Sequence, residues 1–196
     1  MNAARNTFVF GLGLAMALVA GWVAFPRALY SRQNQPVVFR HKTHAEKSGF
    51  ADCGQCHSFR SDGSFAGIPS LDTCASCHSE RLGTSQDEGI LVDHYVKTGQ
   101  EVPWLVYSRQ PANVSFSHAI HVRRGGLACA ACHSRYGESD ETRIYEQDRI
   151  SGYSRNIAGR SIWLVRLGRH DGMKMTDCEG CHRRRNIQVG CLGCHQ

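Results

Sequence analysis

The sequence predicts a mostly helical protein with extensive irregular structure, carried on one N-terminal membrane-spanning helix. Three observations support this fold class. All ten cysteines of the 196-residue chain fall into five short motifs between residues 53 and 195. An uncharged apolar run occupies residues 8–25. Charged residues make up only 20% of the chain and apolar ones 41%, which excludes a disordered protein. We expect an anchor in residues 1–30 and one globular domain in residues 31–196.

The five motifs share the pattern Cys-x-x-Cys-His, which indicates attachment of c-type haem. Both thiols of such a motif bond to one haem, and the adjacent histidine binds the iron from one side. The attachment residues are Cys53, Cys56, Cys74, Cys77, Cys129, Cys132, Cys178, Cys181, Cys191 and Cys194, and the proximal iron ligands are His57, His78, His133, His182 and His195. Five motifs that use every cysteine predict five covalently bound c haems.

Other uses of these cysteines explain the pattern less well. A structural zinc site needs four ligands and no histidine fixed after each pair, and five pairs would leave one site incomplete. A thioredoxin-like motif would occur once, within a βαβ unit. Disulfides would require no histidine after every second cysteine. Haem attachment accounts for both the spacing and the number.

The composition indicates that haem replaces much of the usual core. Five macrocycles in roughly 150 residues leave little chain for a side-chain core, and such small domains need covalent or metal staples. The formal net charge of +6 is not a nucleic-acid footprint, because ten ionised propionates would bring the loaded protein to about −4. We therefore expect no nucleic-acid partner.

The N-terminal element is an apolar run of 18 residues, Phe8 to Phe25, between Arg5 and Arg27. This length is near the minimum for a membrane-spanning helix and long for the core of a signal peptide. The segment ends in Trp22-Val-Ala-Phe25-Pro26, without a convincing small-residue cleavage site. We expect an uncleaved anchor; a removed signal peptide is the alternative.

The orientation of this anchor rests on chemistry more than on charge. More basic residues follow the segment than precede it, which by counting alone argues against an outward C-terminal domain. Covalent attachment of c haem, however, takes place on the outer face of the bacterial plasma membrane. We expect a single anchor in the inner membrane, with the haem domain facing the periplasm.

Two of the five motifs follow a repeated element of pattern Phe-x-His-x-x-His. The first copy, Phe39 to His44, precedes Cys53 by eight residues, and the second, Phe116 to His121, precedes Cys129 by seven. Histidines at i and i+3 share one helical face, so each pair can serve two neighbouring irons. The distal iron ligands predicted from this repeat are His41, His44, His118 and His121.

Four distal histidines leave one of five irons without a sixth ligand. The candidates, in order of preference, are Met175, His170 and His94, and an open site is the remaining possibility. A methionine ligand would raise the reduction potential of that haem above those of its bis-histidine neighbours. Each candidate also has an ordinary explanation, as core filler, loop residue or half-buried helix residue.

Three other segments carry weaker signals. Residues 87–98 have the pattern of a short amphipathic helix with an acidic start, and residues 101–107 that of an extended run. Residues 134–176 form the longest stretch of the soluble part without a haem motif. A long connection in a compact domain is often functional, so this one either docks a partner or wraps the haems. No motif indicates catalytic residues.

The repeat followed by Cys-x-x-Cys-His resembles the multihaem cytochrome c3 and c7 group. The chain is more closely similar to the membrane-anchored pentahaem subunit of alternative complex III, a bacterial quinol-oxidising assembly. Three features carry this resemblance across most of the chain. They are the anchor with five motifs, the Pro103-Trp104 and Val114–Val122 segments before the third motif, and Met175 three residues before Cys178.

The resemblance implies an electron-relay subunit rather than an enzyme in its own right. It implies as partners an iron–sulfur/molybdopterin-oxidoreductase-like subunit, polytopic quinol-binding membrane subunits, and a soluble or complex-bound electron acceptor. It also implies that the first histidine of each pair serves the haem of the following motif, so that His41 faces the Cys53 haem and His118 the Cys129 haem.

Two other functions are compatible with the motifs. A free-standing, membrane-anchored quinol dehydrogenase-type cytochrome would have the same single helix but no large partners. A multihaem reductase would need one open iron with polar catalytic groups around it. The available distal ligands nearly suffice to close all five irons, which favours electron transfer without bond making.

Overall fold

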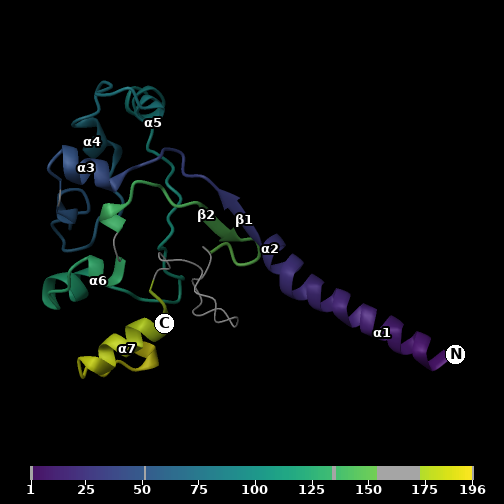
Figure 1. Cartoon of the computed structure of the whole chain (residues 1–196). Helices are drawn as coiled ribbons and strands as arrows, with labels where there is room; N and C mark the ends of the chain where they lie inside the picture. The colour runs from purple at the N-terminus through teal and green to yellow at the C-terminus, as the bar shows by residue number, and fades with distance from the viewer. Residues whose placement is uncertain (1, 51, 134–135, 154–172, 196) are drawn as a thin grey trace.

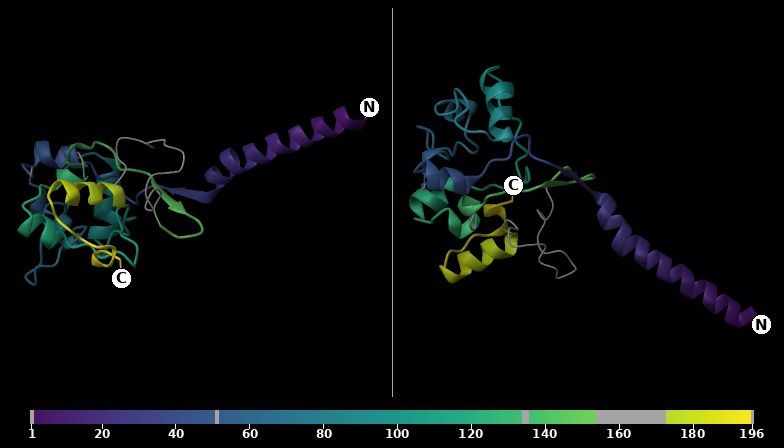
Figure 2. Two further views of the ribbon diagram at one scale, coloured as in Figure 1. Left: turned by 90° about the horizontal axis from the view of Figure 1, so that it is seen from below. Right: turned by 45° about the horizontal axis from the view of Figure 1, so that its top comes forward.

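A computed structural model describes residues 2–50, 52–133, 136–153 and 173–195. Its first element is one long apolar helix that leaves the rest of the protein (Figures 1 and 2). This helix consists of α1 (Asn2–Val19), a π-helical stretch (Ala20–Ala24) and α2 (Phe25–Leu29). Residues Ala3–Leu29 are long and apolar enough to cross a membrane, and none of the most apolar part is buried in the protein.

A two-stranded antiparallel ribbon stands where this helix meets the globular part (Figure 1). Strand β1 (Tyr30–Gln33) pairs with β2 (Tyr145–Asp148), with Tyr30 opposite Asp148 and Gln33 opposite Tyr145. The sequence predicted no strand here. Each strand is only four residues long and pairs with a partner more than 100 residues away, so neither produces a local pattern of alternation.

The remaining elements are short, which confirms the predicted fold class. The α-helices are α3 (His41–Lys47), α4 (Leu71–Ala75), α5 (Gln86–Ile90), α6 (Ala130–His133) and α7 (Met175–Arg184). Two π-helical stretches span Leu91–Val96 and Ala119–Arg124, and three 3₁₀ turns span Cys53–Gln55, Tyr136–Glu138 and Cys191–Gly193. The predicted helix over residues 87–98 is present as α5 and the π-helical stretch that continues it.

Few hydrophobic side chains are buried in the described part of the chain. Val37, Leu71 and Val102 are 5–7% exposed and form one cluster, against which Trp104 and residues of the helix over 86–96 pack. Val92 is fully buried on that helix. This small cluster packs beside the second motif. Most of the rest of the described domain has no side-chain core.

The run over residues 101–107 is non-helical, as predicted, but it belongs to no strand ladder. A side chain takes the place of a neighbouring strand. The amide of Gln35 donates to the Leu105 carbonyl at 2.8 Å and accepts from the Leu105 N–H at 3.0 Å. This contact ties the segment after the anchor to the segment before the second histidine repeat.

Candidate haem sites

Four pairs of imidazole rings face each other across gaps of similar width. Each pair joins one histidine of the repeated element to one histidine of a Cys-x-x-Cys-His motif. Ring centroids lie 6.5 Å apart for His41–His57, 6.2 Å for His44–His78, 6.2 Å for His118–His133 and 6.0 Å for His121–His182. Three of the pairs are close to parallel, at 18°, 5° and 13°, and His44–His78 is inclined at 61°.

These separations are too wide for ring stacking and suit a shared metal ion. An imidazole nitrogen lies about 2 Å from a metal that it binds, so two rings on opposite sides of one ion have centroids roughly 6 Å apart. Rings that stack directly on each other in this protein are closer, as in Phe65–His118 at 4.2 Å. The four gaps therefore fit an iron held between two histidines.

Hydrogen bonds orient several of these rings so that Nε2 is left to bind metal. The Nδ1 atoms of His44, His57 and His121 lie 2.8–2.9 Å from the backbone carbonyls of Arg40, Gly67 and Ser117. A carbonyl can only accept, so Nδ1 is the N–H donor and Nε2 keeps its lone pair. Metal-binding histidines are typically fixed by such a bond on the second nitrogen.

The phenylalanine of each repeat explains why the repeat begins where it does. Phe39 stacks on His44 with centroids 4.3 Å apart and meets His41 edge-on at 4.7 Å. The second copy is built the same way, with Phe116 at 4.5 Å from the later histidine and 4.8 Å from the earlier one. Both copies thus use one aromatic ring to hold two imidazoles at a fixed angle.

Burial keeps several of these imidazoles neutral, as metal binding requires. Burial and the neighbouring His57 ring lower the pKa of His41 below its ordinary value. Burial and the ring of His133 do the same to the pKa of His118, and burial with His57 lowers the pKa of His133. Neutral imidazole is the form that binds a metal ion.

The cysteines do not have the properties of disulfides or thiolate sites. None of the ten, all of which lie in the described residues, is in a disulfide. Burial is the main cause that raises the pKa values of Cys53, Cys74, Cys132 and Cys178, whereas thiolate chemistry needs a lowered pKa. Within the described ranges, no three His, Cys, Asp or Glu side chains converge as ligands of a single ion.

Thiols of different motifs lie close enough to influence one another, and this places the motifs in a spatial order. After burial, the next cause that raises each thiol's pKa is a neighbouring motif. The pairs are Cys53 with Cys129, Cys74 with Cys56, and Cys132 with Cys181, and Cys178 is also affected by Cys194. Among these neighbours the order is second, first, third and fourth, with the fifth beside the fourth.

Direct contacts support the same order. Phe65, in the loop after the first motif, stacks on His118 of the second repeat. In that loop Phe59 lies 4.4 Å below the guanidinium of Arg123. The fifth motif is tied to the same region, because the Ser115 N–H donates to the Cys194 carbonyl at 2.7 Å. The first and third motifs thus join the two halves of the chain.

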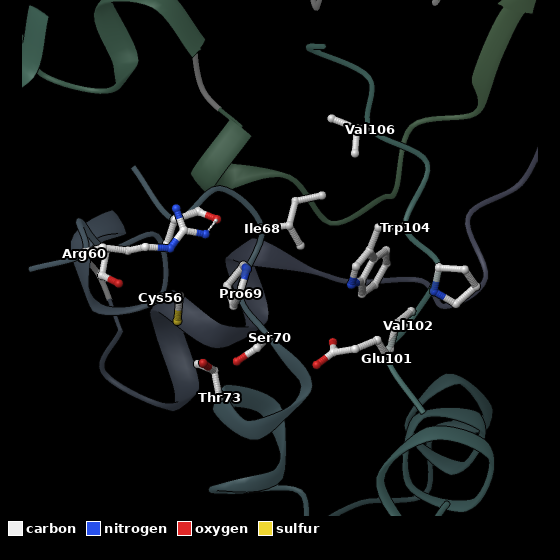
Figure 3. Close-up of a pocket in the computed structure, with 13 residues that line it drawn as sticks. Cys56, Arg60, Ile68, Pro69, Ser70, Thr73, Glu101, Val102, Trp104 and Val106 are labelled. Atoms are coloured by element: carbon white, nitrogen blue, oxygen red, sulfur yellow. Dashed lines mark hydrogen bonds between the residues drawn. The ribbon is translucent and has the colours of Figure 1, made fainter. Parts of the chain in front are cut away.

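A cavity of about 540 Å³ lies beside the first motif (Figure 3). Its wall includes the Cys56 sulfur, the loop residues Ile68 and Pro69, and Trp104 from the opposite segment. This volume is in the range of small-molecule and cofactor sites. An attachment thiol, a wall of mixed polar and apolar side chains and the nearby imidazole pair together suit a covalently held haem.

The fifth motif has no imidazole partner of this kind among the described residues. Met175, the first candidate, begins α7, and its side chain is 57% exposed. His94 is exposed on the π-helical stretch Leu91–Val96. His170 lies outside the described residues, as do residues 134–135 and 154–172 of the motif-free stretch over 134–176. The sixth ligand of this iron therefore stays a prediction with three candidates.

Sequence reasoning missed several residues that shape these sites. It gave no role to Phe65, to the Gly67 carbonyl or to Glu88, whose carboxylate oxygen lies 2.9 Å from Nδ1 of His78. One signal was present. Gly67 follows His57, and Glu88 follows His78, by the same ten residues.

The fold and the paired sites define a multihaem cytochrome c, and the comparisons with known proteins agree. The profile of the class III cytochrome c family matches residues 23–102, and that of cytochrome c7 and related cytochromes c matches residues 114–196. The chain belongs to this family of electron-transfer proteins, which hold several covalent c haems. The first match ends at residue 102 and the second begins at residue 114, both between the second and third motifs.

One relative is similar over nearly the whole chain. It is the multihaem cytochrome c subunit of menaquinone reductase from Nitratidesulfovibrio vulgaris. The two sequences are 41% identical over 202 residues, which cover 95% of this chain and 89% of the relative.

Proposed function

We propose that this protein holds five c haems and relays electrons within a membrane quinone oxidoreductase complex. The observation that carries the proposal is the set of four imidazole pairs, each 6.0–6.5 Å across, in a chain 41% identical to a menaquinone reductase subunit. Haem iron, when bound, supplies one-electron exchange between the ferric and ferrous states. The chain's own part is to hold, orient and shield each iron.

We assign the ligands of four irons from the ring pairs. His41 and His57 would hold the iron of the first motif, and His44 and His78 that of the second. The third would have His118 and His133, and the fourth His121 and His182. Two protein ligands close both faces of an iron, which leaves no place for substrate. For the fifth iron, held by His195, Met175 is the preferred partner, followed by His170 and His94.

The contacts between motifs support a continuous relay. Phe65 of the first motif's loop stacks on His118, which faces the third motif's histidine, so the sites of the two halves of the chain are neighbours. Each histidine repeat holds two neighbouring sites on one short helical element, so adjacent sites cannot drift apart. Covalent attachment fixes the remaining degrees of freedom.

The N-terminal helix supports attachment to a membrane. We propose that Ala3–Leu29 is an uncleaved anchor and that residues 31–196 form the haem domain on the periplasmic side of a bacterial inner membrane. The helix extends away from the described part of the haem domain, which it meets at the ribbon (Figure 2). Partners in the membrane would be polytopic quinone-binding subunits, with an iron–sulfur/molybdopterin-oxidoreductase-like subunit outside it.

The direction of electron flow separates two versions of this proposal. The printed name of the relative concerns reduction of menaquinone, which supports delivery of electrons to a quinone pool. The resemblance to the alternative complex III subunit implies the opposite direction, from quinol to a periplasmic acceptor. The first version has the support of similarity over the whole chain, and we prefer it.

The test is to solubilise native membranes in mild detergent, isolate this cytochrome and identify the subunits that accompany it. We expect oxidoreductase-like and polytopic subunits, and a loaded chain whose mass exceeds that of the polypeptide by five haems. Chemically reduced complex should then be reoxidised by a menaquinone analogue. Recovery of the cytochrome alone would instead support a free-standing anchored carrier. Reduction by quinol, without reoxidation by menaquinone, would reverse the direction.

A further inference from the structure

The histidine of the second motif has a different hydrogen-bond partner from the other oriented rings. Nδ1 of His57 donates to the backbone carbonyl of Gly67 at 2.8 Å. Nδ1 of His78 lies 2.9 Å from a carboxylate oxygen of Glu88, at the same distance along the chain. A neutral acceptor in one site is thus replaced by an anionic one in its neighbour.

Glu88 is held firmly in this position. Its Oε1 also accepts from the Leu82 N–H at 2.8 Å, and its Oε2 accepts from the Gly83 N–H at 2.9 Å. The side chains of His78 and Glu88 are only 20% and 13% exposed. Two backbone donors and the His78 ring therefore hold the carboxylate in one place.

Apart from the His78 ring, no basic side chain in the described part of the chain pairs with this carboxylate. The guanidinium of Arg81, in the same segment, pairs with Asp93 instead. The negative charge of Glu88 is thus directed at the imidazole ring. A carboxylate bound to the second nitrogen of a metal-binding histidine makes that ring a more basic ligand.

We propose that Glu88 is a positioning residue that lowers the reduction potential of the haem at the second motif relative to the haem at the first. The inference rests on the proposed binding of that iron by His78. A more basic ligand and a nearby negative charge both favour the ferric state, and hydrogen bonding around the ligand is a recognised determinant of haem potential.

The test is a potentiometric titration of the loaded, detergent-purified protein and its Glu88→Gln variant. The glutamine oxygen can still accept from His78, so the change removes the charge while keeping a neutral bond like that of His57. We expect one midpoint potential to rise and the other four to stay in place. In the ferric state, one low-spin electron paramagnetic resonance signal should change its g values.

Asp87→Asn is the matched control. Asp87 precedes Glu88 on α5, but its carboxylate accepts from the Val38 N–H at 3.2 Å and does not contact a haem-site histidine. The control should leave all five midpoints in place. A shift of the same size in both variants would overturn the inference, because a general loss of charge would then explain it.

The haem count and the spin state separate failure of this inference from failure of the proposed ligands. A Glu88→Gln protein with five low-spin haems and unchanged potentials would overturn the role of Glu88 and leave the ligand assignment intact. A wild-type protein with no haem at the second motif would overturn both.

A measurement on the wild type covers the case in which the variant does not load. In the reduced, diamagnetic protein labelled with ¹⁵N-histidine, one proximal Nδ1 should have a ¹⁵N chemical shift that differs from the others. We expect this shift to be displaced towards the value of imidazolate. Equal shifts for all proximal histidines would contradict the proposal.

Discussion

At the scale of single residues, His118 shows how tightly a distal position is built. Its ring is nearly parallel to that of His133, at 5° and 6.2 Å. Phe65 stacks on it from the other half of the chain, and Phe116 meets it edge-on at 4.8 Å. Alanine at this position would leave no group that can bind iron.

Replacing His118 by alanine should therefore open one iron. We expect the loaded variant to retain five haems and, when reduced, to bind about one carbon monoxide per protein, whereas the wild type binds less. Ile120→Ala is the control, because Ile120 lies two residues after His118 and its side chain is 57% exposed. An unchanged low-spin spectrum without carbon monoxide binding would refute the assignment of His118.

At the scale of elements, α3 serves two sites because its two histidines lie on one face. His41 faces His57, and His44 faces His78. Phe39 contacts both histidines of α3. One added residue rotates everything beyond it by about 100° relative to the preceding turn. The spacing of three residues is thus what allows one seven-residue helix to join two sites.

An alanine inserted between Thr43 and His44 should uncouple the two sites that α3 joins. The first site should keep its His41 partner while the second loses His44, so that reduced protein binds about one carbon monoxide. The same insertion between Ser48 and Gly49 is the control, since the helix has ended there and Gly49 has a positive φ of 73°. Equal carbon monoxide binding by both variants would contradict this role of α3.

At the scale of the whole molecule, the N-terminal helix and the haem domain are joined by one small ribbon. Among the described elements, α2 contacts β1, and the Arg149 N–H after β2 donates to the Leu29 carbonyl at 2.9 Å (Figure 1). The domain's sites are built from residues 39–195, so none of them depends on the helix.

Replacing residues 1–29 by a cleavable signal peptide should then release a soluble, fully loaded domain. In a host without partner subunits, we expect the full chain in the membrane fraction and the truncated chain in the periplasmic fraction, with the same absorption spectrum. A truncated chain that stays with the membranes would show that another surface binds lipid. Loss of haems would show that the helix helps to build the sites.

Much of this protein follows from its sequence because the decisive features are contiguous. A haem attachment motif needs five neighbouring residues, an anchor needs an unbroken apolar run, and two histidines on one helical face need a spacing of three. The fold class and the helix over residues 87–98 were predicted on such grounds, and both are present. The tertiary structure decided which rings face each other, as for His44 with His78 and His121 with His182. It also decided the contact of Phe65 with His118 and the pairing of β1 with β2. These depend on contacts between distant segments, which packing around the sites selects and no local pattern encodes.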